Sequence, residues 1–168
     1  MGLRLIAISI CLAANANAWA TECASQSCPP SFQDYPAPST TRAVLHVPLV
    51  LSTTLARQYR TVITQQASEA ADFADHYKVA TWGCGTDCRG FAIINQRDGR
   101  VYTMPGLEYV AGVAGNAEDR LAYRLDSRLF VITGRKNDED EGKFYYRWNG
   151  NALKLILRTE ITKESFED

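Results

Sequence analysis

Between residues 55 and 74, hydrophobic side chains recur at every third or fourth position. The apolar members of the pattern are Leu55, Tyr59, Val62, Ile63, Ala67, Ala70 and Phe73. Polar residues such as Arg57, Arg60, Gln65 and Glu69 fall on the opposite side. This spacing predicts an amphipathic helix from Leu55 towards Ala74, ending somewhere between Ala67 and Ala74. The run Ser52-Thr53-Thr54 offers N-cap residues for it.

From Tyr77 onward the hydrophobic period changes to two, which is typical of half-buried strands. The predicted strands are Tyr77 to Trp82, Gly90 to Asn95, Arg100 to Met104, Leu121 to Leu125, Leu129 to Thr133, Lys143 to Trp148 and Ala152 to Ile161. Asp98-Gly99 and Asn149-Gly150 are two-residue hairpin signals. Lys136 to Gly142 reads as a charged turn, and residues 106–119 are ambiguous.

A helix followed by a series of hairpins predicts an α+β fold. We expect one N-terminal amphipathic helix packed on an antiparallel, hairpin-rich sheet. A small β-sandwich is the second choice. Before the helix, Arg42 to Leu51 is apolar but interrupted by Pro48, which suits an edge strand or an extended lead-in.

The first twenty residues predict a cleaved secretory signal peptide. A single positive charge at Arg4 precedes the apolar run Leu5 to Ala14, and small residues at Ala16, Ala18 and Ala20 follow. The run is about half the length of a membrane-spanning helix. We place cleavage after Ala20, a Pro-, Ser- and Thr-rich arm at residues 21–41, and a single globular domain at residues 42–168. The predicted location is the periplasm, with full secretion as the alternative.

The charge balance argues against nucleic acid as a partner. The chain has 19 acidic and 18 basic side chains, so it carries no general basic field to attract a polyanion. No later segment is apolar and long enough to predict a membrane span. The sequence leaves the oligomeric state open.

The cysteines fit an oxidising compartment. Cys11 leaves with the signal peptide, so Cys23, Cys28, Cys84 and Cys88 remain. Their spacing favours two local disulfides, Cys23–Cys28 and Cys84–Cys88. The alternative connectivity joins the N-terminal arm to Cys84.

The segment Trp82-Gly83-Cys84-Gly85-Thr86-Asp87-Cys88 is the most informative of the chain. Its flanking glycines allow a tight turn in which the two cysteines meet, and this favours a structural disulfide. A thiol redox pair is a second interpretation, although such cysteines are commonly separated by two residues and precede a helix. A thiolate metal site completed by His76 or Asp87 is a third. We expect no cofactor.

Catalytic signatures are missing from the sequence. There is no G-x-S-x-G elbow, no H-E-x-x-H and no glycine-rich phosphate loop before a helix. Asp72, Asp75 and His76 could act as acid–base partners, although such clusters near a helix end are more often solvated or capping groups. The acidic residues 138–141 lack calcium-loop spacing and read as a solvated turn.

Aromatic residues supply a last group of candidates. Alternation places Phe144, Tyr146 and Trp148 on one sheet face and Tyr145 on the other. Tyrosine on an outer face next to a rigid loop is one way to build a recognition surface. Our candidate binding residues are therefore Trp82, Asp87, His76 and Tyr145.

Six segments of the chain resemble those of a group of small exported bacterial proteins that share a W-G-C-G-T-x-C loop. The matching segments are Tyr59–Ile63, Asp72–Tyr77, Trp82–Cys88, Asp98–Tyr102, Tyr123–Leu129 and Tyr145–Trp148. Asp75 stands where such proteins are expected to have glycine. The resemblance implies an exported, disulfide-bearing domain and supplies no substrate.

Size, export and the closed loop together favour a non-enzymatic binding protein. We expect a protein partner in the cell envelope, with inhibition or neutralisation of an envelope-acting protein as one role. The alternative is a thiol redox or metal-handling protein centred on Cys84 and Cys88.

Overall fold

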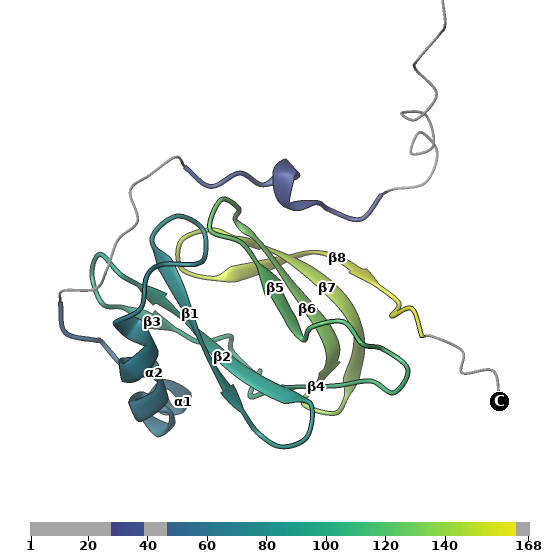
Figure 1. Cartoon of the computed structure of the whole chain (residues 1–168), viewed down its shortest axis with the longest axis horizontal. Helices are drawn as coiled ribbons and strands as arrows, with labels where there is room; N and C mark the ends of the chain where they lie inside the picture. Colours follow the sequence, from purple (N-terminus) through teal and green to yellow (C-terminus); the bar gives the residue numbers. More distant parts are fainter. Residues whose placement is uncertain (1–27, 39–46, 164–168) are drawn as a thin grey trace, which may run out of the picture.

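The computed structural model describes residues 28–38 and 47–163. Within these ranges, eight strands form one antiparallel sheet (Figure 1). The strands are β1 (Tyr77–Gly83), β2 (Cys88–Asn95), β3 (Val101–Tyr102), β4 (Val110–Ala111), β5 (Leu121–Tyr123), β6 (Leu129–Lys136), β7 (Asp140–Trp148) and β8 (Leu153–Thr159). The predicted antiparallel, hairpin-rich sheet is confirmed. The predicted signal peptide and Cys23 lie outside the described residues.

The sheet consists of two halves that are joined by β4. One half contains β1, β2 and β3, and the other contains β5, β6, β7 and β8. The two residues of β4 pair with Cys88 and Arg89 of β2 on one side and with Arg135 and Lys136 of β6 on the other. Residues 106–119, which the sequence left ambiguous, therefore contain the connection between the halves.

The main hydrophobic core lies between these two halves. Phe91 of β2 stacks on Phe130 of β6 with ring centroids 4.9 Å apart, and Tyr77 of β1 meets Trp148 of β7 edge-on at 5.2 Å. Phe144, Tyr146 and Trp148 all belong to this cluster, whereas Tyr145 belongs to a different one. The alternation predicted for β7 is confirmed.

The outer face of β1 and β2 packs against two short helices, α1 (Thr54–Gln58) and α2 (Arg60–Ala67). The Thr53 side chain accepts a hydrogen bond from the Ala56 amide at 3.1 Å, so the predicted N-cap region is confirmed. A continuous helix is wrong, because Tyr59 departs from helical geometry (φ −99°, ψ 22°) between α1 and α2. The second helix ends at Ala67, the early end of the predicted range.

A segment of the N-terminal arm covers the outer face of β6 and β7. This strap, residues 30–37, contains a short 3₁₀ helix, η1 (Phe32–Asp34). Phe32 and Tyr35 pack against the cluster of Leu129, Val131 and Tyr145. The buried Ser127 hydroxyl lies 2.8 Å from the Phe32 carbonyl and 3.0 Å from that of Tyr35. For the described residues, apolar contacts and a buried hydroxyl therefore anchor the Pro-, Ser- and Thr-rich arm on the sheet.

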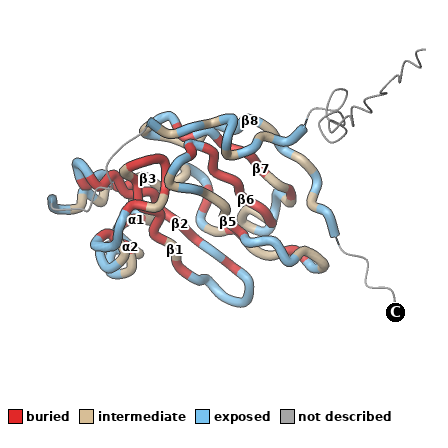
Figure 2. The backbone as a smooth tube through the Cα atoms, turned by 45° about the horizontal axis from the view of Figure 1, so that its top comes forward, coloured by how far each residue is buried: buried red, intermediate tan, exposed pale blue. Residues whose placement is uncertain are grey.

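Two of the turns follow the sequence signals and one is shorter than predicted. Gly99 (φ 74°) and Gly150 (φ 104°) take the left-handed conformation that the hairpin signals require. The charged turn at Lys136–Gly142 contracts to three residues, because Lys136 and Asp140 already pair as strand residues. Asn137 (φ 50°) and Asp138 (φ 62°) make this tight turn. Burial concentrates in β1, β2, β6 and β7, whereas β8 is largely exposed (Figure 2).

Candidate functional site

The hairpin between β1 and β2 ends in an exposed, covalently closed loop. This tip loop comprises residues 83–88, and its first five residues are exposed (Figure 2). Cys84 and Cys88 are disulfide-bonded to each other, with their α-carbons 5.2 Å apart. The local Cys84–Cys88 pairing predicted from spacing is confirmed. The bridge also excludes the alternative in which Cys84 bonds to the N-terminal arm.

Asp87 fixes the tip loop to the rest of the sheet. Its carbonyl accepts a hydrogen bond from the Gly112 amide at 2.7 Å, directly after β4. Its carboxylate lies over the α-carbon of Gly112, where a Cβ atom would collide with it. The buried Arg120 guanidinium lies 3.6 Å from the same carboxylate. Asp87 is therefore both exposed and held in place.

Trp82, another predicted binding residue, belongs to the interior. Its indole is 6% exposed and stacks on Tyr59 with centroids 4.2 Å apart. The ring lies across Gly90, where a side chain would clash with it. Trp82 therefore supports the hairpin from beneath the α1–α2 junction and does not face solvent.

His76 lies at the opposite end of β1, beside an unexpected buried carboxylate. Its Nδ1 is 2.7 Å from Oδ2 of Asp75, and the Arg97 guanidinium is 3.1 Å from the same oxygen. The Asp75 side chain is only 2% exposed. For Asp75, the interpretation of a solvated acidic residue is wrong, because His76 and Arg97 both hold it inside.

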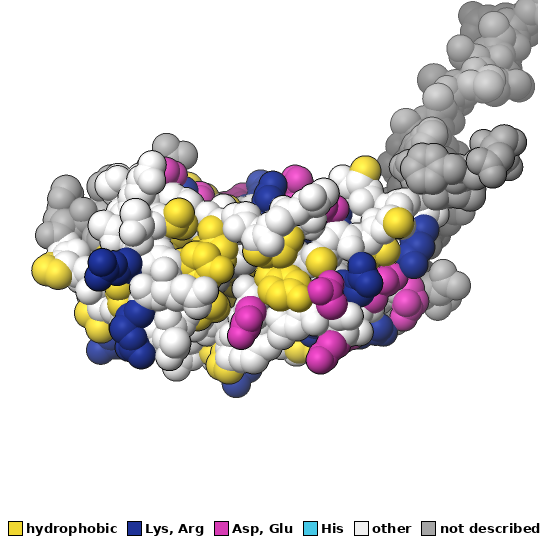
Figure 3. Space-filling view, turned by 90° about the horizontal axis from the view of Figure 1, so that it is seen from below, with side chains coloured by type: hydrophobic (Ala, Val, Ile, Leu, Met, Phe, Trp, Pro, Cys, Tyr) yellow, Lys and Arg dark blue, Asp and Glu magenta, His cyan; other side chains and the backbone are white. Residues whose placement is uncertain are grey.

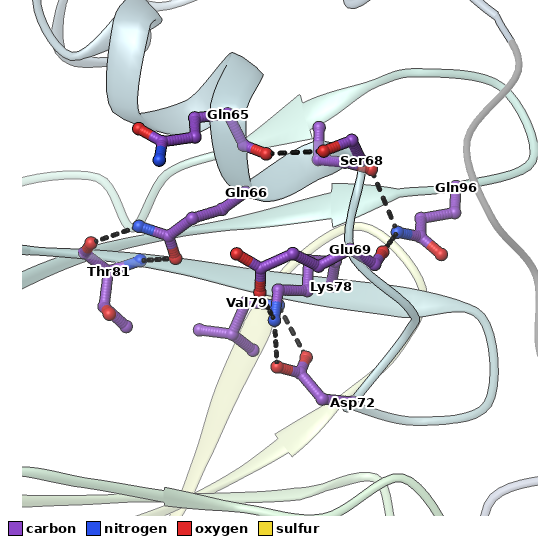
Figure 4. A network of polar contacts seen from close by, with 10 residues as sticks. Gln65, Gln66, Ser68, Glu69, Asp72, Lys78, Val79, Thr81 and Gln96 are labelled. Atoms are coloured by element: carbon purple, nitrogen blue, oxygen red, sulfur yellow. Dashed lines mark hydrogen bonds and ion pairs between the residues drawn. The ribbon is translucent and has the colours of Figure 1, made fainter.

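Asp72 belongs to a neighbouring polar network that ties the end of α2 to β1 (Figure 4). Asp72 and Glu69 both contact the nearly buried Lys78 ammonium, at 2.8 and 2.9 Å. Burial acts to lower the pKa of Lys78, but the two carboxylates outweigh it and the pKa lies above its ordinary value. The Gln66 side chain accepts a hydrogen bond from the Thr81 amide at 3.0 Å and donates one to the Thr81 carbonyl at 2.7 Å. A neighbouring strand would make the same pair of bonds.

Tyr145 lines a groove beside the strap. The groove has a volume of about 390 Å³, and Phe32, Val131 and Lys143 contribute to its walls. Tyr145 itself is only 6% exposed. The structure thus places Tyr145 on the predicted outer face, but as packing for the strap rather than as an open tyrosine surface.

The four candidate residues do not form one site. Trp82 and Asp87 belong to the tip region, whereas His76 is separated from Cys84 by the whole of β1, about 20 Å of extended chain. His76 therefore cannot complete a metal site with the two cysteines. Within the described residues, no group of three or more His, Cys, Asp and Glu side chains is arranged to hold a metal ion.

Three of the four acidic residues 138–141 contact nearby side chains. Asp140 is 2.9 Å from the Lys136 ammonium, Glu141 is 2.9 Å from that of Lys163, and Asp138 accepts a hydrogen bond from the Tyr109 hydroxyl at 2.8 Å. Charged side chains of both signs also lie among hydrophobic ones on the face seen in Figure 3. The turn thus carries ion pairs instead of a free calcium-binding cluster.

The sequence interpretation missed Arg97 and Arg120. The hairpin register could have indicated Arg97, since its neighbour Gln96 pairs with the His76 carbonyl through a 3.1 Å hydrogen bond. Arg120 comes from a segment without a clear pattern, so no local signal pointed to its contact with Asp87. Both arginines reach their carboxylates from segments that are distant in the sequence.

Comparisons with protein-family models, with curated proteins and with solved structures found no match for this chain. In the part of the chain that the structure describes, no helix has the length and hydrophobicity needed to cross a membrane. The tip loop and the turn around Asp75 are the two places where the described structure builds a distinctive geometry.

Proposed function

We propose that this chain is an exported, non-enzymatic binding protein that acts in the periplasm and contacts a protein partner in the cell envelope. The observation that carries the proposal is the covalently closed and exposed tip loop. We favour a role as an inhibitor or neutraliser of that partner.

The tip loop has the physical properties of a preorganised contact. The Cys84–Cys88 bridge restricts the loop before binding, so that less conformational entropy is lost on association. Gly112 and Arg120 hold Asp87 at the loop's base while its side chain stays 56% exposed. Thr86 and Asp87 would therefore meet a partner in a nearly fixed geometry.

Site-specific photo-cross-linking tests this assignment. A photoreactive residue at Thr86 should give one specific adduct in envelope extract, and unlabelled native protein should compete for it. Removing the bridge with the double substitution Cys84→Ser and Cys88→Ser should reduce the yield of that adduct. Identification of the adduct by mass spectrometry would supply the partner whose activity is then assayed with and without the protein.

A photoreactive residue at Glu139 is the matched control. Glu139 is also exposed and lies at a hairpin turn, but its turn contains no disulfide. Equal adducts from both positions, or none from Thr86, would remove the tip loop as the contact site. Export is tested by the mass of the protein from the envelope fraction, which should begin near Thr21.

The thiol redox alternative is favoured by one observation, the exposure of Cys84 at the loop surface. A structural disulfide in an exported protein should resist glutathione, with a reduction potential below about −300 mV. We expect this behaviour. A potential near −200 mV, together with rapid alkylation of Cys84 after mild reduction, would instead support thiol exchange.

A further inference from the structure

A second site lies at the other end of β1, where the chain builds a polar pocket around Asp75. The pocket has a volume of about 230 Å³. Its walls include Asp75, His76, Tyr77, Arg97, Arg128 and Trp148. It is separated by the length of β1 from the tip loop, so the proposed protein contact does not use it.

The backbone at this pocket adopts conformations that are rare for residues other than glycine. Ala74 (φ 41°) and Asp75 (φ 84°) are consecutive residues in the left-handed region. Their amides donate hydrogen bonds to the carbonyls of Arg124 at 3.2 Å and Leu125 at 2.8 Å. Strained conformations of this kind persist where surrounding structure imposes them, and they concentrate at functional sites.

The Asp75 carboxylate is only half satisfied. The side chains of His76 and Arg97 both contact its Oδ2 atom. Its buried Oδ1 atom has no hydrogen-bond partner among the described residues. A buried acceptor without a donor is unfavourable, so such an atom points to a missing ligand or water. Because Asp75 also lines the pocket, we look for the missing donor in a ligand bound there.

The same pocket has an excess of positive charge. Arg97 shares the Asp75 carboxylate with His76. Arg128 donates a hydrogen bond to the Pro36 carbonyl at 3.2 Å and forms no ion pair with a described residue. Two guanidinium groups and one carboxylate thus line the same pocket. Arginine binds carboxylates in a planar, two-point geometry, which suits an anionic ligand. Tyr77 and Trp148 supply an aromatic wall beside these charges.

We infer that this pocket binds a small carboxylate that also carries a hydrogen-bond donor, as a free α-amino acid or α-hydroxy acid does. The ligand carboxylate lies between Arg97 and Arg128, and its amino or hydroxyl group donates to Oδ1 of Asp75. The aromatic wall limits the size of the remaining side chain. This assignment is independent of the tip loop.

Calorimetric titration with four small probes tests the inference. L-alanine and L-lactate carry both groups, propionate lacks the donor, and L-alanine methyl ester lacks the anion. The first two should bind saturably, and the last two at least tenfold more weakly. Tryptophan fluorescence should follow the same order, since Trp148 lines the pocket. Propionate or the ester binding as tightly as L-alanine would overturn the inference, as would no binding of L-alanine and L-lactate.

Two variants tie binding to the pocket. Asp75→Gly removes the carboxylate at a backbone angle that glycine adopts freely, so the fold should persist. Arg128→Gln removes the spare charge from the surface. Each should weaken L-alanine binding at least tenfold. Arg124→Gln is the control, because Arg124 pairs with Asp126 at 2.9 Å and does not line the pocket. Unchanged binding by both pocket variants would contradict the assignment.

Discussion

The two ends of the β1–β2 hairpin are stabilised in different ways. The tip loop is exposed and is held by a covalent bond and by the contacts of Asp87, whereas the end around Asp75 is held by buried aromatic and polar contacts. Phe73, Asp75 and Lys78 all lie in the second region. A covalent link allows a loop to project without a core beneath it, and a packed end has to recruit partners from distant segments. The first arrangement suits contact with a large partner, and the second suits enclosure of a small ligand.

Removal of Phe73 should have the largest effect on this comparison. Phe73 is fully buried, and its ring lies 5.4 Å from that of Phe130 and 6.2 Å from that of Trp148. Phe73→Ala should lower the free energy of unfolding by about 3–5 kcal/mol, because it leaves a cavity in the main core. Urea denaturation measures the change. A loss below about 1 kcal/mol would mean that the packed end contributes less than the contacts indicate.

Removal of the disulfide should have a smaller effect. The bridge closes a loop of only a few residues, so the combined Cys84→Ser and Cys88→Ser change should cost about 2 kcal/mol. Chemical shift changes should concentrate in residues 83–88 and around Gly112, and His76 should keep its native signals. Shifts that extend to His76 would show that the two ends are not independent.

Gln66 tests how β1, the strand that joins the two ends, is fastened to its helix. Its amide makes two hydrogen bonds with the Thr81 backbone on β1 (Figure 4). Gln66→Ala should lower the free energy of unfolding by about 1–2 kcal/mol, since both backbone groups lose a partner. Gln65→Ala is the matched control on the exposed side of α2 and should change stability by less than about 0.5 kcal/mol. Equal effects would assign the loss to the helix rather than to the contact with β1.

The same contrast explains what could be predicted from the sequence. The Cys84–Cys88 pairing and the alternation of Phe144, Tyr145 and Tyr146 depend on local spacing, so the sequence revealed them. Burial of Asp75 depends on Arg97, 22 positions away, and on a turn held by carbonyls of residues 124 and 125. Likewise, the strap is anchored by Ser127, 95 positions beyond Phe32. Local periodicity contains no information about such partners.

Alkaline pH should produce the smallest and most gradual effect, and part of that effect should come from the packed end. Burial raises the pKa of Tyr77 and of Tyr123 above the usual 10.0, and the pKa of Lys78 is raised as well. Each of these groups binds its proton more tightly in the folded state. Their contribution to stability is therefore complete below about pH 10 and is lost as the pH rises through the folded-state pKa values.

Urea unfolding between pH 8 and pH 11 should show this decline beginning near pH 10. Tyr123→Phe should make the decline shallower, because phenylalanine has no proton to lose. Most of the difference between this variant and the native protein should survive 0.5 M salt, since burial is the largest cause of the raised pKa of Tyr123, ahead of the nearby carboxylates. A native protein whose stability is constant to pH 11 would contradict the argument. A decline that salt abolishes would instead assign the effect to exposed charges, outside the packed end.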